Sequence, residues 1–318
     1  MKNNEFGYLE NMNRAWIIAV LLCLGTGAFA QYPRVVYGKL VRLDSFPSRH
    51  VAKRNVDILL PEGYTSGKRY DVLYMHDGQM LYDSATTWNK LSWDVDDVLG
   101  RLVNSGKIRE VIVVGVWNSG PGRHADYFPQ KPFESLPRSV QDSLYGAARG
   151  SGASVFQGER VHSDNYLEFL VTELKPYIDQ NYSTHKDRAH TFIAGSSMGG
   201  LISMYAICEY PDVFGGAACL STHWPGVFTV ENNPIPDAFF RYMAERLPDP
   251  STHKLYFDHG NQTLDALYPP LQRRADSVLM KKGYGSANLL SKSFPGTDHS
   301  EKAWRTRLDQ PLEFLLVR

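Results

Sequence analysis

A serine flanked by glycines is the strongest chemical signal in the sequence. Residues 195–199 read Gly-Ser-Ser-Met-Gly and place Ser197 at the centre of a G-x-S-x-G pattern. An apolar segment precedes this pattern and a helix-like segment follows it, which is the strand–turn–helix setting of a nucleophile elbow. Glycines suit so tight a turn because they carry no Cβ atom, and the turn lifts the serine hydroxyl clear of the sheet. The pattern therefore predicts that Ser197 is a nucleophile.

A serine hydroxyl is a poor nucleophile without a general base, and His299 is the predicted base. It lies in the segment Phe294-Pro295-Gly296-Thr297-Asp298-His299-Ser300, directly after the last predicted strand. In elbow hydrolases the chain order is serine, acid, histidine, and a loop at the end of the sheet returns the histidine to the elbow. His299 has both the order and the place that this role requires.

Two aspartates are candidates for the acid that would orient His299 and stabilise its imidazolium form. Asp258 lies inside a predicted strand over residues 254–259, whereas Asp265 lies in the loop that follows. A side chain within a strand points into one face of the sheet rather than beyond its end. We therefore favour Asp265 and keep Asp258 as the alternative.

Two backbone N–H groups are predicted to stabilise a developing oxyanion. Met198 opens the helix after the elbow, where N–H groups and the positive end of the helix dipole face the nucleophile. Gln79 follows Gly78 in the loop after the third predicted strand, the usual source of the second donor. The residues expected to contact a substrate are His76, Asp77, Trp117, Asn118, Arg123, His223 and Trp224.

Several of the candidate substrate contacts have a structural alternative. Trp88, Trp93, Trp117, Trp224 and Tyr127 either line a cleft, where aromatic rings stack on sugars or aromatic acyl groups, or pack in the core. The same choice between substrate and packing holds for His223, and Arg123, His124 and Asp126 face either a polar substrate or solvent. No second histidine lies at ligand spacing from His76, so neither a metal nor a cofactor is expected.

The elements that must position these residues alternate between strand and helix, which predicts an α/β fold with a mostly parallel sheet of about eight strands flanked by helices. The first two strands alternate in polarity and are expected to form an antiparallel edge. Helices are predicted over residues 201–209 and 271–281, and residues 119–162 are expected to form a long irregular lid or binding loop. The strands are predicted over 35–43, 51–60, 70–76, 110–117, 189–195, 215–221, 254–259 and 289–294.

The N-terminal 30 residues are predicted to be a signal peptide, with residues 31–318 as a single domain. Residues 15–30 are apolar, are too short for a membrane span of about 20 residues, and end in the small-x-small sequence Ala28-Phe29-Ala30. Translation starting at Met12 would give a more compact leader, and an uncleaved anchor is the alternative. We therefore expect a periplasmic or extracellular protein without a membrane span after cleavage.

The charge balance limits the possible partners, and the cysteine content limits how the fold can be stabilised. The 318 residues hold 34 Lys and Arg against 34 Asp and Glu, so no basic excess indicates nucleic acid or anionic lipid as an obligate partner. Only Cys208 and Cys219 lie beyond the leader, as either a disulfide or two buried thiols. Stability must come chiefly from the core.

These residues together resemble the esterase family of α/β-hydrolases that groups esterase D-like enzymes, feruloyl and acetylxylan esterases, and enterochelin esterases. The resemblance implies an α/β-hydrolase fold and acyl transfer through a serine acyl-enzyme, with Ser197, His299 and Asp265 as nucleophile, base and acid. Gln262 stands where relatives often have Glu, and Gln cannot serve as the acid. The segments that carry the resemblance are 72–79, 113–116 with Asn118 and Arg123, 195–201, 260–268 and 296–304.

The sequence thus predicts an exported serine carboxylesterase that hydrolyses acetyl or feruloyl-type esters of carbohydrates. A siderophore lactone esterase is one alternative, which an Arg/Lys cluster near Ser197 would favour. A sugar acyltransferase, in which a sugar hydroxyl replaces water, is another. A non-catalytic binding protein fits least, because a binding module has no use for an elbow serine paired with a general base.

Overall fold

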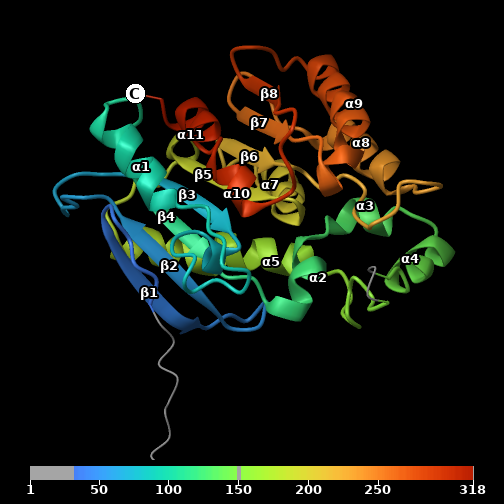
Figure 1. The fold of residues 1–318 in the computed structure, drawn as a ribbon, viewed down its shortest axis with the longest axis horizontal. Coiled ribbons are helices and arrows are strands. Elements are labelled where there is room, and N and C mark those ends of the chain that lie inside the picture. The colour runs from blue at the N-terminus through green and yellow to red at the C-terminus, as the bar shows by residue number, and fades with distance from the viewer. Residues whose placement is uncertain (1–31, 149–151, 318) are drawn as a thin grey trace, which may run out of the picture. The chain divides into compact units, whose positions relative to one another are not determined.

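An eight-stranded sheet forms the centre of the fold (Figure 1). Its strands lie in the order β1-β2-β4-β3-β5-β6-β7-β8. The computed structural model describes residues 32–148 and 152–317, so the predicted signal peptide lies outside the described residues. The strands are β1 Lys39–Phe46, β2 Arg54–Leu60, β3 Asp71–His76, β4 Val111–Val116, β5 Thr191–Ser196, β6 Gly216–Leu220, β7 Lys254–His259 and β8 Leu289–Ser293.

The pairing of the strands confirms the predicted mostly parallel sheet. Strand β2 runs antiparallel to both β1 and β4, and every pair from β4 to β8 is parallel. The two N-terminal strands therefore form the antiparallel edge that their alternating polarity indicated. The loops after β3 to β8 leave the sheet at one edge, because the carboxyl ends of parallel strands meet there.

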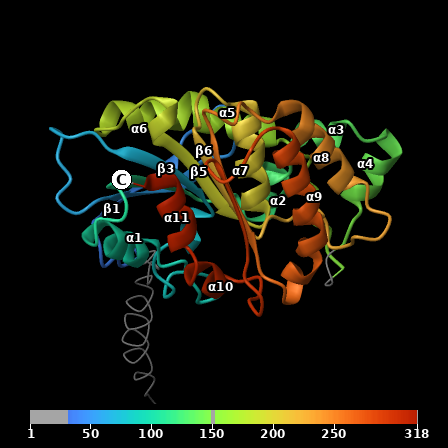
Figure 2. The same ribbon diagram turned by 90° about the horizontal axis from the view of Figure 1, so that it is seen from above.

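Each inner strand feeds two cores because its side chains alternate between the faces of the sheet. In β3, Val72 and Tyr74 belong to one buried cluster, and Leu73 and Met75 belong to the other. Figure 2 shows α5, α6 and α7 on one side of the sheet and α1 and α11 on the other. The helices are α1 Val95–Asn104, α2 Arg123–Tyr127, α3 Gln130–Glu134, α4 Arg138–Tyr145, α5 Ser163–Phe169, α6 Lys175–Asn181, α7 Met198–Glu209, α8 Ile235–Arg246, α9 Tyr268–Lys281, α10 Glu301–Arg305 and α11 Asp309–Leu316.

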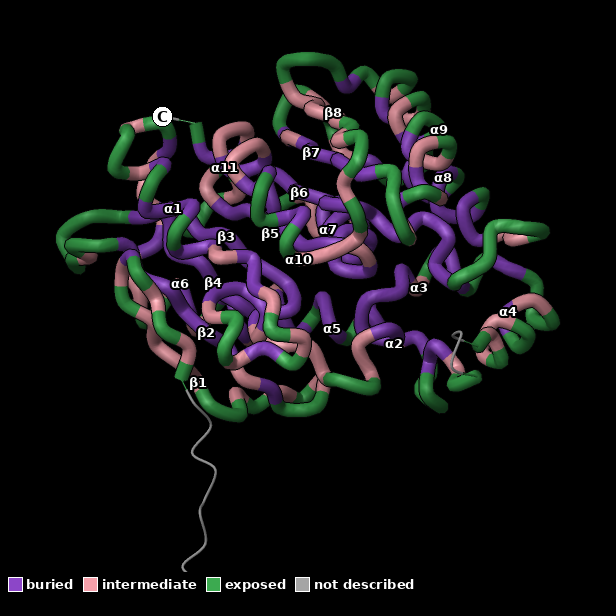
Figure 3. Tube along the Cα trace, viewed as in Figure 1, coloured by how far each residue is buried: buried purple, intermediate pink, exposed green. Residues whose placement is uncertain are grey.

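The tube coloured by burial shows the inner strands and α7 buried, and it shows exposed residues mainly in the outer loops (Figure 3). In the described part of the chain, no helix is both long enough and apolar enough to span a bilayer.

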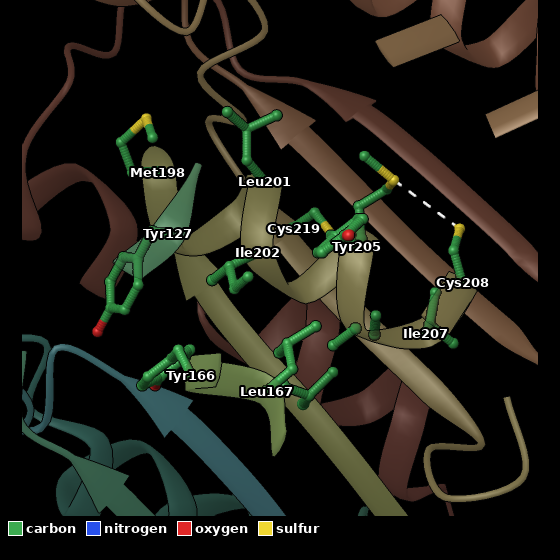
Figure 4. Close-up of a cluster of buried hydrophobic side chains, with 14 of the residues drawn as sticks. Tyr127, Tyr166, Leu167, Met198, Leu201, Ile202, Tyr205, Ile207, Cys208 and Cys219 are labelled. Atoms are coloured by element: carbon green, nitrogen blue, oxygen red, sulfur yellow. Dashed lines mark hydrogen bonds between the residues drawn. The ribbon is translucent and has the colours of Figure 1, made fainter. Parts of the chain in front are cut away.

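Helix α7 is buried on all sides, and this fixes the position of the elbow that precedes it. Every residue from Met198 to Cys208 is buried. Figure 4 shows Leu201, Ile202 and Tyr205 of this helix among the buried side chains of α5 and the sheet. The helix begins three residues before the predicted Leu201, because the chain enters it directly from Ser197. Cys208 and Cys219 are free buried thiols, which settles the choice left open by the sequence.

The expectation of an irregular segment over residues 119–162 was wrong. Its described residues include α2, α3 and α4, which are five to eight residues long. Their aromatic side chains hold them against the core: Phe128, Phe133 and Phe156 contact one another, and Phe128 also contacts Phe239 of α8. Helices this short leave too few turns for a clear period in the sequence.

Candidate active site

Ser197 lies on a sharp turn between β5 and α7. Its backbone has φ 57° and ψ −120°, a strained conformation for a residue with a Cβ atom. The Ser197 N–H donates to the carbonyl of Leu220 in β6 at 2.9 Å, which holds the turn against the neighbouring strand. A Cβ atom on Gly195 would lie 2.8 Å from the backbone of Gly199, so a larger residue at position 195 would displace the turn. The predicted steric reason for glycine therefore applies at Gly195.

His299 and Asp265 form a direct hydrogen bond. Nδ1 of His299 lies 2.5 Å from Oδ1 of Asp265, a carboxylate with no solvent exposure. The backbone N–H of His299 also donates to the Thr263 hydroxyl at 3.0 Å, so the residue is held through both its side chain and its backbone. In this arrangement Nδ1 carries the proton and Nε2 is left to accept one.

A polar network that the sequence did not reveal holds the Asp265 carboxylate. Its Oδ2 accepts hydrogen bonds at 2.6 Å from both the Ser221 hydroxyl and the Gly260 N–H. The Ser221 oxygen in turn accepts from Trp304 Nε1 at 3.0 Å and from Arg307 Nη2 at 2.8 Å. These hydrogen bonds hold the buried Asp265 carboxylate in one orientation.

Asp258, the alternative acid, has a different partner. Its carboxylate binds the buried guanidinium of Arg307 at 3.0 and 3.1 Å and accepts from the Tyr256 hydroxyl. It lies inside β7, and His299 is bonded to Asp265 instead. The structure thus favours Asp265 as the partner of the imidazole.

Tyr268, to which the sequence assigned no role, lies next to both Ser197 and His299. Its ring meets the His299 ring edge-on with centroids 5.8 Å apart. Burial raises the pKa of its hydroxyl well above the usual value, against a smaller opposing effect of the nearby Ser197 side chain. The Tyr268 hydroxyl also lies 2.8 Å from Nδ1 of His223. Among the described residues no hydrogen bond joins Ser197 directly to His299. Proton transfer therefore requires the Ser197 hydroxyl to turn towards Nε2 of His299.

The two predicted oxyanion donors flank the elbow from α7 and from the loop after β3. Met198 is the first residue of α7, so its N–H has no acceptor within the helix. Gln79 lies in the short 3-10 turn Gly78–Met80, where the opening N–H groups likewise lack an acceptor within the turn. A Cβ atom on Gly78 would lie 2.5 Å from the backbone of Gly115 in β4. The loop therefore passes too close to β4 to carry a side chain at position 78.

Three of the predicted substrate contacts bind one another. The Asp77 carboxylate accepts from Arg123 at 2.6 and 2.8 Å and from Asn118 Nδ2 at 2.7 Å. Burial raises the pKa of Asp77, but the Arg123 charge and these hydrogen bonds outweigh it and hold the pKa below its usual value. Asp77 is therefore a carboxylate at neutral pH.

The remaining predicted contacts divide between the site and the core. His76 is buried with Nδ1 2.8 Å from the Tyr166 hydroxyl, and burial lowers the pKa of His76 to about 3. Burial likewise lowers the pKa of His223 well below its usual value, so both imidazoles are neutral. Trp117 donates to Asp57 at 2.8 Å. Trp224 is fully buried between Phe240 and Phe257 and offers no surface to a substrate, which corrects that prediction.

One group of potential metal ligands occurs in the described residues, away from the elbow. Ligand atoms of Asp71, His185 and His190 lie within 4.8 Å of one another. Asp71 opens β3 at the amino edge of the sheet, opposite the edge that carries Ser197. Its carboxylate already pairs with Arg109 at 2.7 Å, and His190 bonds Asp187 at 2.8 Å. These partners compete with any cation, so we assign no metal to this group.

An elbow serine at the carboxyl edge of a mostly parallel eight-stranded sheet defines an α/β-hydrolase. The family model described as "Putative esterase" matches residues 49–315. The chain belongs to this esterase family.

Curated relatives are similar over part of their own length. A bifunctional endo-1,4-beta-xylanase/feruloyl esterase of Xylanibacter ruminicola is 25% identical over 273 residues, which cover 82% of this chain and 29% of that protein. The uncharacterized protein YbbA of Bacillus subtilis is 25% identical over 180 residues, 56% of this chain and 60% of that protein. The chain thus spans less than two thirds of either relative.

Solved structures share the fold at lower identity. A CE1 ferulic acid esterase from Anaeromyces mucronatus in complex with ferulic acid has a TM-score of 0.60 and 18% identity, covering 90% of this chain and 94% of that one. The enterochelin esterase of Shigella flexneri has a TM-score of 0.60 and 16% identity, covering 90% and 59%. Both likenesses support the fold and leave the substrate open.

Proposed function

We propose that the protein is an exported carboxylesterase that hydrolyses acyl esters of carbohydrates, with Ser197, His299 and Asp265 as its catalytic triad. The observation that carries this proposal is the buried Asp265 carboxylate bonded to His299 beside an elbow serine. Asp265 fixes the proton on Nδ1, so that Nε2 is the base for the serine hydroxyl.

In the first half of the reaction, the Ser197 hydroxyl turns towards Nε2 of His299 and attacks the ester carbonyl. Nε2 of His299 takes the hydroxyl proton, and the carbonyl oxygen becomes an oxyanion that accepts from the N–H groups of Met198 and Gln79. His299 then gives its proton to the departing alcohol, leaving an acyl-serine. Water repeats the same steps, releases the acid and restores Ser197.

The carbohydrate part of the proposal is supported by similarity and by the aromatic residues at the rim. The bifunctional relative from Xylanibacter ruminicola carries feruloyl esterase in its name. Trp88 is 82% exposed, and the adjoining Asn89 donates to Glu301, two residues after His299. An exposed tryptophan on the segment that contacts Glu301 suits stacking on a sugar ring. Export is supported by the apolar residues 15–30 and the Ala28-Phe29-Ala30 sequence.

The siderophore alternative receives no support from the charges around Ser197. A ferric chelate is anionic and would call for unpaired cations, whereas Arg123 pairs with Asp77. Transfer of the acyl group to a sugar hydroxyl would use the same residues and differ only in the acceptor.

Hydrolysis assays on the wild-type protein and Ser197→Ala test the proposal. We expect the wild type to hydrolyse p-nitrophenyl acetate and the variant to lose at least about 1,000-fold in kcat, because it lacks the nucleophile. A parallel screen of acetylated xylan, methyl ferulate and a catecholate trilactone separates the substrate classes. Preference for the trilactone would overturn the carbohydrate assignment, and undiminished hydrolysis by the variant would overturn the nucleophile.

A further inference from the structure

The residue between the end of β3 and the oxyanion loop adopts an unusual backbone conformation. Asp77 has φ 58° and ψ 45°, in the left-handed region that few residues with a Cβ atom adopt. It directly precedes Gly78 and Gln79, so its conformation sets the direction in which the Gln79 N–H points. A strained backbone persists only where surrounding contacts hold it.

Those contacts come from the segment after β4. Arg123 donates from Nε to Oδ1 of Asp77 and from Nη2 to Oδ2. This bidentate geometry fixes the carboxylate in one orientation. Asn118 adds a third bond to Oδ1, and its own N–H donates to the Gln79 side chain at 3.2 Å. The Asp77 N–H donates to the Tyr127 hydroxyl at 3.3 Å. The loop is therefore held through both the side chain and the backbone of Asp77.

The same carboxylate lies beside the start of the elbow helix. A Cβ atom on Gly199, the second residue of α7, would lie 3.5 Å from Oδ2 of Asp77. The Asp77 side chain is only 10% exposed, so solvent screens its charge weakly. An unpaired negative charge at this place would oppose the oxyanion that forms near the N–H groups of Met198 and Gln79.

We propose that the Asp77–Arg123 ion pair holds the oxyanion loop in its productive conformation and neutralises the Asp77 charge beside the developing oxyanion, which makes Arg123 a positioning residue. This inference rests on the proposed function, since it needs an oxyanion to form. The geometry of the guanidinium suits this role, because two of its nitrogens bind Asp77 and it lies 5.2 Å from the centre of the Tyr127 ring. An arginine that binds substrate would instead direct its bidentate hydrogen bonds to the substrate.

The size of the electrostatic part follows from Coulomb's law. For like unit charges about 6 Å apart at an effective dielectric constant near 20, the repulsion corresponds to a rate factor on the order of 100. Replacing Arg123 with the uncharged Met leaves Asp77 without its charge partner. Replacing Asp77 with Asn at the same time removes the uncompensated charge and keeps one acceptor oxygen for Asn118.

The test is a double-variant cycle on kcat and KM for p-nitrophenyl acetate, using Arg123→Met, Asp77→Asn and the double variant. We expect R123M to lower kcat on the order of 100-fold with KM within about threefold of wild type, and the double variant to recover at least about tenfold of that loss. Arg109→Met is the matched control, because Arg109 also makes two bonds to an aspartate, Asp71, at the other end of β3. It should change thermal stability but not kcat.

Three results would overturn the proposal. A rise in KM with little change in kcat for R123M would assign Arg123 to direct substrate contact. A double variant no more active than R123M would leave only a structural role. Equal losses of kcat in R123M and R109M, with equal losses of melting temperature, would show a general effect of breaking a buried ion pair. None of these results bears on the proposed function, which the Ser197→Ala comparison decides separately.

Discussion

Replacing Asp265 with Asn isolates the one contact on which the proposed base depends. Oδ1 of Asp265 accepts from His299 Nδ1, and Oδ2 accepts from the Ser221 hydroxyl and the Gly260 N–H. Asn has one acceptor oxygen and one NH₂ group. The Gly260 N–H belongs to the backbone and cannot reverse its direction, so the amide oxygen is expected to face Gly260 and the NH₂ group to face His299.

An NH₂ group facing Nδ1 forces the imidazole into the opposite tautomer. Nδ1 must then accept, the proton moves to Nε2, and Nε2 can no longer take the Ser197 proton. In serine proteases the corresponding Asp-to-Asn change lowers kcat about 10⁴-fold, which equals about 5 kcal/mol of transition-state stabilisation. The reversed amide would set NH₂ against the Gly260 N–H at a cost of about 1–3 kcal/mol, which leaves a productive minority of a few per cent. We therefore expect kcat to fall between about 20- and 10⁴-fold.

The assay is steady-state hydrolysis of p-nitrophenyl acetate by Asp265→Asn and by Asp258→Asn, with melting temperatures for both. D258N breaks the buried pair with Arg307 and should lose stability, while the His299–Asp265 bond stays in place. Activity of folded D265N within about threefold of wild type, together with loss of activity in folded D258N, would refute the reasoning and move the acid to Asp258.

Three further predictions test other parts of the site. Tyr268→Phe removes a hydroxyl close to the Ser197 side chain. If that hydroxyl competes with His299 for the serine by about 1 kcal/mol, its loss raises the rate of fluorophosphonate labelling about fivefold; a fall would mean that Tyr268 assists the nucleophile. Trp88→Ala should leave kcat/KM for p-nitrophenyl acetate unchanged and raise KM for polymeric acetylated xylan about three- to tenfold; equal effects on both substrates would remove Trp88 from sugar binding. The buried His76 stays neutral in the folded protein, whereas the same side chain gains a proton below pH 6.5 in the unfolded chain. The free energy of unfolding should therefore drop by about 2 kcal/mol between pH 7 and pH 5 because of this residue. Urea unfolding of His76→Asn should show that much less pH dependence, and an unchanged pH dependence would contradict the prediction.

The sheet could be predicted closely because its signals are local. Val111–Val116 is a continuous apolar run, and a strand buried on both faces needs such a run. The glycines around Ser197 are likewise a local consequence of a turn with no room for side chains. Strand ends were less accurate: β1 begins at Lys39 instead of Val35, because pairing with β2 decides where it starts.

The polar network behind the proposed triad could not be predicted, because its members are brought together only by the fold. Ser221, Trp304 and Arg307 lie on three different segments, and no spacing in the sequence connects them with Asp265. Trp224 was misjudged for the same reason: an aromatic residue after a strand end is equally suited to a cleft or to the core, and only packing decides. The charges of Asp77 and Arg123 would suit binding to a substrate as well as binding to each other. Only the folded structure shows that the two side chains form an ion pair.

Peptide mapping after reaction with a fluorophosphonate tests the central claim most directly. If Ser197 is the nucleophile and His299 its base, one equivalent of the probe attaches to Ser197, and the labelling rate falls by several orders of magnitude in a folded His299→Ala variant. Attachment to a different residue, or equally fast labelling of Ser197 without the imidazole, would contradict the account.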